Sequence, residues 1–179
     1  MDRFLDDLAA ATPVPGGGSA ACYAAALAVA LGEMVVGLGA RKQGTTPPLL
    51  ATLAAHRQWF KEAADNDAKS FLKVLAAYRL AKDDPGRPAA IASGLQEAAR
   101  SPLAMMARMT EVKTDLFAAK EFCPKSALSD WRAAGILLDA AFQVAVENVR
   151  VNLDGASERA DLEHSLANLE LAYGRLKDA

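Results

Sequence analysis

Residues 12–40 read TPVPGGGSAACYAAALAVALGEMVVGLGA, an apolar run placed directly behind three consecutive glycines. Alanine, leucine and valine dominate residues 20–40, where Glu33 is the one charged residue, and alanine and leucine favour helix over strand. Ser19 can cap this helix, which we expect to end before Gly44. The stretch therefore predicts a long buried helix whose small side chains let neighbouring helices or a second subunit approach closely.

The same run is long enough to be a membrane span, because about 20 apolar residues cross a bilayer. However, its alanine and glycine content makes it only mildly hydrophobic, and the rest of the chain is typical of soluble helices. We therefore favour a core helix covered by its neighbours, with no membrane partner. The acidic N-terminus MDRFLDDL does not resemble a secretory signal.

The composition predicts one all-α domain, residues 1–179. Hydrophobic residues make up 52% of the chain but aromatic residues only 6%, which favours closely packed helices over a sheet. The formal net charge of -2 provides no general attraction for nucleic acid. Cys22 and Cys123 form no metal-binding motif with histidine, so we expect reduced thiols, a cytoplasmic protein and no metal.

Proline, glycine and capping residues divide the remaining chain into helices. Thr46 with Pro47 starts one helix, DDPGRP separates that helix from the next, and Ser129 caps the one after. We expect an orthogonal bundle of about six helices that dimerises through its long helices. Besides the apolar run, the expected helices span residues 2–11, 46–82, 88–120 (bent at Pro102), 130–153 and 158–176.

Asp67 interrupts an apolar stripe on the helix predicted at 46–82. The stripe, at helical spacing, consists of Phe60, Ala64, Asp67, Phe71, Val74 and Tyr78. A buried carboxylate requires a partner, a raised pKa or a cationic ligand. Two interpretations remain open for Asp67: a functional carboxylate, or a structural ion pair or helix cap.

Two asparagines continue a stripe of small residues on the helix predicted at 130–153. Asn148 and Asn152 follow Ala141 and Ala145, and amides can bind the edge of a heterocycle, although such residues more often bond their own helix. Asp130 alone is ordinary for a first helical turn. The Gly-rich turn lacks a Walker A ending, and it either receives a flat ligand or simply permits tight packing.

A resemblance that extends over nearly the whole chain narrows these alternatives. FLDDLAAATPVPGGGSAACYAAALAVALGEMV closely resembles the N-terminal signature of the cyclodeaminase/cyclohydrolase family. DAKSF, SPLAMM and SDWRAAGILLDAAFQVAVENVRVNL are similar to later segments of that family, in the same order. Where related cyclohydrolases commonly carry Gly-Asn-x-Asn, this chain has Cys-Pro-Lys-Ser at 123–126.

The resemblance implies an all-α homodimer with folate sites at or near the subunit contacts. The pocket residues that it implies are Gly16, Gly17, Gly18, Ser19, Lys42, Asp67, Asp130 and Asn152. In this interpretation Asp67 is the general base. Lys42 orients the reacting oxygen or pairs with Asp67. Either of the two residues can be the more important one for catalysis. Lys125 is a candidate contact for the glutamate tail. A tetrahydrofolate derivative is the substrate, and no other cofactor is expected.

The implied reaction is hydrolysis of 5,10-methenyltetrahydrofolate to 10-formyltetrahydrofolate. Two alternatives remain open: cyclisation of 5-formiminotetrahydrofolate with loss of ammonia, and a non-catalytic folate-binding or scaffold protein. Both reactions pass through a tetrahedral carbon between N5 and N10, so the site residues alone distinguish poorly between the two reactions. We expect the hydrolase because no formiminotransferase sequence accompanies this domain.

Overall fold

The structure is a computed structural model that describes residues 2–154, 156 and 158–176. The described residues form six α-helices and two short 3-10 helices, and no strand occurs among them, which confirms the all-α class. The elements are α1 (Asp2–Ala9), α2 (Gly17–Gln43), α3 (Leu49–Tyr78), α4 (Arg87–Ala118), η1 (Ala119–Phe122), η2 (Lys125–Ala127), α5 (Leu128–Leu153) and α6 (Arg159–Gly174).

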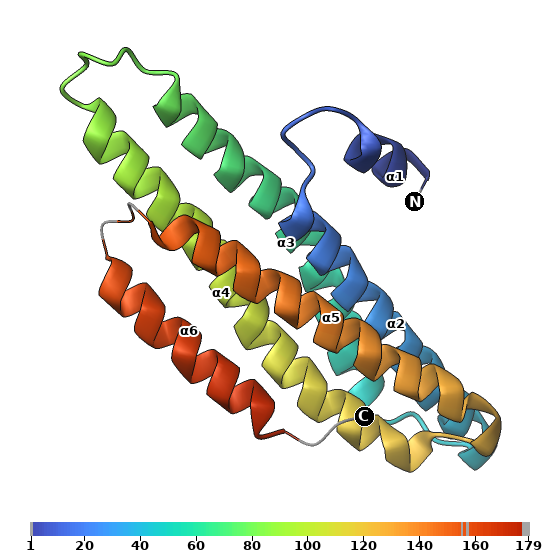
Figure 1. Ribbon diagram of the computed structural model, residues 1–179. Coiled ribbons are helices and arrows are strands. Elements are labelled where there is room, and N and C mark those ends of the chain that lie inside the picture. The colour runs from blue at the N-terminus through green and yellow to red at the C-terminus, as the bar shows by residue number, and fades with distance from the viewer. Residues whose placement is uncertain (1, 155, 157, 177–179) are drawn as a thin grey trace.

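The four long helices α2 to α5 lie lengthwise beside one another, with α6 along α4 and α5 (Figure 1). The predicted orthogonal arrangement is therefore wrong. Each long helix carries small or apolar residues along most of its length, and lengthwise packing against a helix of similar length buries such a stripe. The fully buried side chains include Phe60, Met105, Met106 and Phe142, contributed by α3, α4 and α5.

Helices α2 and α5 begin earlier than the serine caps predict. Gly16 is the N-cap residue of α2, so Ser19 lies inside the first turn, where its hydroxyl bonds to α3 instead of capping. Helix α5 begins at Leu128, which places Ser129 and Asp130 in its first turn. Both serine caps are therefore wrong, while the acidic residue near the start of α5 is confirmed.

Helix α2 is the predicted core helix, and its small residues permit close contacts. A side chain at Gly32 would collide with Leu116, and one at Gly39 would overlap the carbonyl oxygen of Phe122. By length and hydropathy α2 is also the one helix among the described residues that could cross a membrane. Half of its most apolar window is buried inside the structure.

Large apolar side chains remain exposed on both α2 and α5. We name these residues together the α2–α5 apolar face, and its members are Leu27, Met34, Leu38, Ile136, Val144 and Val151. Ile136 and Val151 are 69% and 72% exposed, which is unusual for large aliphatic residues in the middle and last turn of a long helix. Apolar surface of this kind indicates an interaction site.

Candidate functional site

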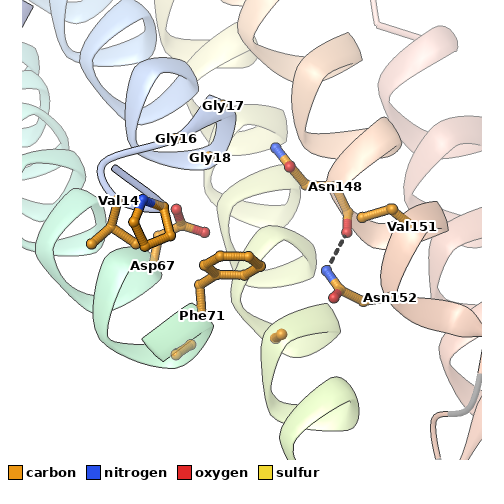
Figure 2. A pocket seen from close by; sticks show the side chains of 12 residues that line it. Val14, Gly16, Gly17, Gly18, Asp67, Phe71, Asn148, Val151 and Asn152 are labelled. Carbon is orange, nitrogen blue, oxygen red and sulfur yellow. Dashed lines mark hydrogen bonds between the residues drawn. The ribbon is translucent and has the colours of Figure 1, made fainter. Parts of the chain in front are cut away.

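The Gly-rich turn closes one end of a cavity of about 160 Å³ between α2, α3, α4 and α5 (Figure 2). Two prolines around Val14 prevent helix before residue 16, and the chain then enters α2 directly above α3. The cavity is lined by Pro13, Val14, Gly16, Gly17, Gly18, Asp67, Ser70, Phe71, Ala98, Asn148, Val151 and Asn152. The turn, Asp67 and Asn152 were predicted to share a site, and the structure brings them together.

Asp67 faces this cavity and is held against the first turn of α2. The Ser19 hydroxyl donates to Asp67 Oδ2 at 3.3 Å and to the Ala64 carbonyl oxygen at 3.1 Å, and the Ser19 backbone N–H also bonds to the carboxylate. Asp67 thus caps α2 from a neighbouring helix. Burial raises the pKa of Asp67, and the hydrogen bonds from Ser19 only partly oppose this rise.

The three glycines have different surroundings. A Cβ atom at Gly18 would lie 2.5 Å from the Asp67 carboxyl carbon, so the approach of this carboxylate excludes any side chain at residue 18. A Cβ at Gly17 would make ordinary contacts of 3.8 Å with Asn148 and Val144, and one at Gly16 would meet nothing within 4 Å. None of these glycines has a positive φ, so the turn depends on their missing side chains and not on left-handed backbone angles.

Asn148 and Asn152 both reach the cavity from the last turns of α5. The Asn148 side-chain amide donates to the Val144 carbonyl oxygen at 3.0 Å, and that of Asn152 donates to the Asn148 carbonyl oxygen at 2.7 Å. These bonds fix the NH₂ groups to the helix backbone. The amide oxygens remain acceptors for a ligand. The interpretation of both residues as local hydrogen-bonding partners is therefore confirmed, and their side chains also line the cavity (Figure 2).

Lys42, Lys125 and Asp130 lie at the opposite end of the bundle from this cavity. Lys42 is exposed in the last turn of α2, about 36 Å from Gly18 at a rise of about 1.5 Å per residue. Asp130 and Asn152 stand at opposite ends of α5, and Lys125 is exposed in η2 just before it. Pairing of Lys42 with Asp67 within one chain is therefore wrong, because helix α2 separates them by its whole length.

The cavity has a simple electrostatic character. Among the described residues that line it, Asp67 is the one ionisable side chain, and the Asn148 and Asn152 oxygens add further acceptors. Such a site suits a ligand with positive charge and N–H donors. A partly buried carboxylate with a raised pKa is also suited to take a proton from water. The described residues contain no group of three or more His, Cys, Asp or Glu side chains placed for a metal ion.

Several lining residues were not predicted as site residues. Asn148 and Phe71 were recognised on the correct helix faces, but neither was assigned to the pocket. Phe71 lies one helical turn after Asp67, and that i, i+4 spacing was the available signal. Val14, Ser70 and Val151 carried no comparable signal, because their place in the cavity depends on how four helices pack.

Comparisons with known proteins agree with this architecture. The chain matches the formiminotransferase-cyclodeaminase family over residues 1–170. It is 32% identical to a methenyltetrahydrofolate cyclohydrolase from Methylorubrum extorquens, with 95% of this chain and 86% of that protein covered. It is 31% identical to the formimidoyltransferase-cyclodeaminase of Mus musculus, with 84% of this chain and 30% of that protein covered.

A solved structure extends the comparison to the fold. The formiminotetrahydrofolate cyclodeaminase of Thermotoga maritima superposes with a TM-score of 0.84 at 26% identity, covering 97% of this chain and 89% of that one. The match includes the Gly-rich turn, the Asp67 helix and the asparagine-bearing helix, since the family region spans all three. The chain belongs to the formiminotransferase-cyclodeaminase family.

Proposed function

We propose that this protein is a folate one-carbon enzyme that hydrolyses 5,10-methenyltetrahydrofolate to 10-formyltetrahydrofolate. The observation that carries the proposal is the partly buried Asp67 carboxylate, facing a cavity whose lining offers acceptors and, among its described residues, no cationic side chain. The substrate's one-carbon bridge is a cation delocalised over N5, the bridge carbon and N10. A carboxylate near that bridge stabilises its charge.

In this mechanism Asp67 acts as the general base. Its carboxylate takes a proton from water as the water oxygen attacks the bridge carbon, which gives a neutral tetrahedral adduct. The adduct hydroxyl then loses its proton to solvent as the bond from that carbon to N5 breaks, N5 takes up the proton held by Asp67, and the carbon remains on N10 as a formyl group. One water is consumed and one proton is released overall. The raised pKa of Asp67 makes its carboxylate a better base than an exposed aspartate.

The rest of the site binds the folate in this proposal. The backbone of Gly16 has room for the flat pterin ring to approach, because a Cβ atom there would meet nothing within 4 Å. The oxygens of Asn148 and Asn152 accept hydrogen bonds from the N–H groups of the pterin.

We further propose a homodimer formed through the α2–α5 apolar face. A two-fold axis across the middle of this face makes each chain's helices antiparallel to those of its partner. The Gly17 end of one chain then lies beside the partner subunit's Lys42 and the partner subunit's Asp130. In this arrangement the partner subunit covers the exposed Ile136 and Val151. Site residues that lie at opposite ends of one chain then meet between the two chains. The partner subunit's Lys125 is then placed for the glutamate tail.

Cyclodeamination of 5-formiminotetrahydrofolate is the second candidate, supported by the superposition on the Thermotoga maritima cyclodeaminase. In that reaction N10 attacks the formimino carbon and ammonia leaves, through a similar tetrahedral carbon. The hydrolase is placed first because the identity is 32% with the Methylorubrum extorquens cyclohydrolase, compared with 26% with the Thermotoga maritima cyclodeaminase.

Turnover of both folates by the purified protein tests the proposal. Methenyltetrahydrofolate absorbs in the near ultraviolet, so its hydrolysis removes this absorbance and its formation from formiminotetrahydrofolate creates it. Asp67→Asn preserves shape but removes the base, and we expect about a hundredfold to ten-thousandfold loss of kcat. Asp65→Asn is the matched control, because Asp65 is exposed on the same helix. A wild-type protein that binds folate but transforms neither compound would favour the non-catalytic alternative.

A further inference from the structure

We propose that the ring of Phe71 binds the positively charged one-carbon bridge of the substrate and makes the cavity selective for cationic over neutral folates. This inference rests on the proposed folate function and assigns a substrate-binding residue to it.

Phe71 presents an aromatic ring to the cavity beside the carboxylate. It follows Asp67 by four residues on α3, so both side chains leave the helix on the same side. Figure 2 shows the ring below Asp67 and pointing toward Asn152. Phe71 is 38% exposed, whereas Phe60 and Val74 on the same stripe are almost completely buried. The exposed part of this phenylalanine is therefore available to a ligand in the cavity.

The groups around the ring all favour positive charge. The face of a phenyl ring carries the negative part of its quadrupole and attracts cations within about 6 Å. Asp67 supplies a full negative charge when ionised, and the Asn148 and Asn152 oxygens supply partial ones. No lysine or arginine occurs among the described lining residues to oppose this field. A delocalised, flat cation that lies on the ring matches this arrangement in both shape and charge.

The charge of the bridge changes during the proposed reaction. The methenyl bridge is a cation, and the formyl group of the product is neutral. A contact with the cation therefore binds substrate more tightly than product and helps the product to leave. Because the tetrahedral adduct has already lost this charge, the contact acts mainly on the ground state, and its removal raises KM more than it lowers kcat.

The test compares a cationic and a neutral folate in three variants. Phe71→Leu removes the aromatic face but keeps an apolar side chain, and Phe71→Tyr retains an aromatic ring. Leu72→Ala is the matched control, because Leu72 is exposed on α3 but does not line the cavity. The readouts are kcat and KM for methenyltetrahydrofolate, and the inhibition constant of 5-formyltetrahydrofolate, which is neutral at the one-carbon group.

For Phe71→Leu we expect KM for the cation to rise about 5- to 30-fold, as loss of a cation–π contact of about 1 to 2 kcal/mol predicts. The inhibition constant of the neutral folate should change less than about twofold, and both Phe71→Tyr and Leu72→Ala should stay near wild type. An equal loss of affinity for both folates would overturn the proposal, because Phe71 would then make packing contacts that do not depend on the charge of the ligand. A fall in kcat with unchanged KM would overturn it as well.

Failure of the proposed function gives a different result. If the wild-type protein binds methenyltetrahydrofolate without consuming it, dissociation constants of the same two folates are measured by direct titration. The ratio of the two dissociation constants is then compared between wild type and Phe71→Leu. A weaker preference for the cationic folate in Phe71→Leu supports the proposal, and an unchanged ratio overturns it. A wild-type protein that binds neither folate overturns both proposals.

Discussion

The surroundings of each glycine in residues 16–18 explain why a glycine stands there. Gly18 lies against the Asp67 carboxylate, so a side chain and the carboxylate compete for one position. Gly16 and Gly17 have space for at least a methyl group, and their backbone angles are open to other residues. Gly18 is thus needed to build the site, whereas the other two glycines leave the backbone open to a ligand.

Gly18→Ala is expected to displace the Asp67 carboxylate and to lower turnover at least tenfold, because catalytic geometry tolerates shifts of well under about 1 Å. Gly16→Ala is the matched control for stability alone, since its methyl group meets nothing within 4 Å. Its free energy of unfolding should stay within about 1 kcal/mol of wild type. Chemical denaturation of both variants and turnover of Gly18→Ala check this. Equal activity of Gly18→Ala and wild type would contradict the placement of Asp67.

Asp67 should also make stability depend on pH. Burial raises its pKa in the folded chain, so the folded state binds this proton more tightly than the unfolded state. The free energy of unfolding therefore falls as pH rises from the ordinary aspartate value of about 4 through the raised folded value. Asp67→Asn cannot ionise. The melting temperature of Asp67→Asn relative to wild type should thus increase from about pH 4 to neutral pH.

Thermal unfolding across this pH range, followed by circular dichroism, provides the measurement. Asp65→Asn serves as the control, because that carboxyl group is exposed on the same helix. A difference between Asp67→Asn and wild type that does not vary with pH would contradict the effect of burial. So would an equally large pH dependence in Asp65→Asn.

At the level of helices, the sequence predicts which segments are helical better than where each one begins. The apolar run and the stripe around Phe60 identify α2 and α3 because helical periodicity is a local property. The start of α2 is different, because the group that caps it, Asp67, comes from another helix. Local capping rules therefore selected Ser19, which the structure places two residues inside the helix.

Two glycines of α2 provide a test of its close packing. Gly39→Ala would overlap the Phe122 carbonyl oxygen and should destabilise the fold by about 1 to 3 kcal/mol, as overpacked core substitutions do. Gly37→Ala meets nothing within 4 Å and should stabilise the helix by about 0.5 to 1 kcal/mol. Urea denaturation of both variants measures these changes. If Gly39→Ala were as stable as Gly37→Ala, the contact between α2 and η1 would be wrong.

At the level of the whole molecule, the predicted site residues divide into two groups. Gly16, Gly17, Gly18, Asp67 and Asn152 surround one cavity, and Ser19 supports it. Lys42, Lys125 and Asp130 lie at the far end of the same chain. No local pattern could reveal this separation, because it follows from the lengths and directions of α2 and α5. The α2–α5 apolar face, which extends between the two ends, supports the proposal that a second subunit joins them.

The proposed antiparallel dimer makes a specific prediction for mixed subunits. Asp67→Asn and Lys42→Ala should each abolish most turnover as pure proteins. After the two are unfolded and refolded together, a mixed dimer contains one site with both changes and one site with neither. Random pairing puts about half of the chains in mixed dimers, so about a quarter of the wild-type activity should return.

Turnover of the mixture, normalised to a wild-type sample refolded in the same way, measures this recovery. Sedimentation of each variant confirms that dimers form. A control mixture of Asp67→Asn with an Asp67→Ala variant changes the same residue in both chains, and it should recover no activity. Were the first mixture as inactive as its components, with dimers intact, Lys42 and Asp67 would not act in a shared site. The exposed Ile136 and Val151 would then require a different explanation.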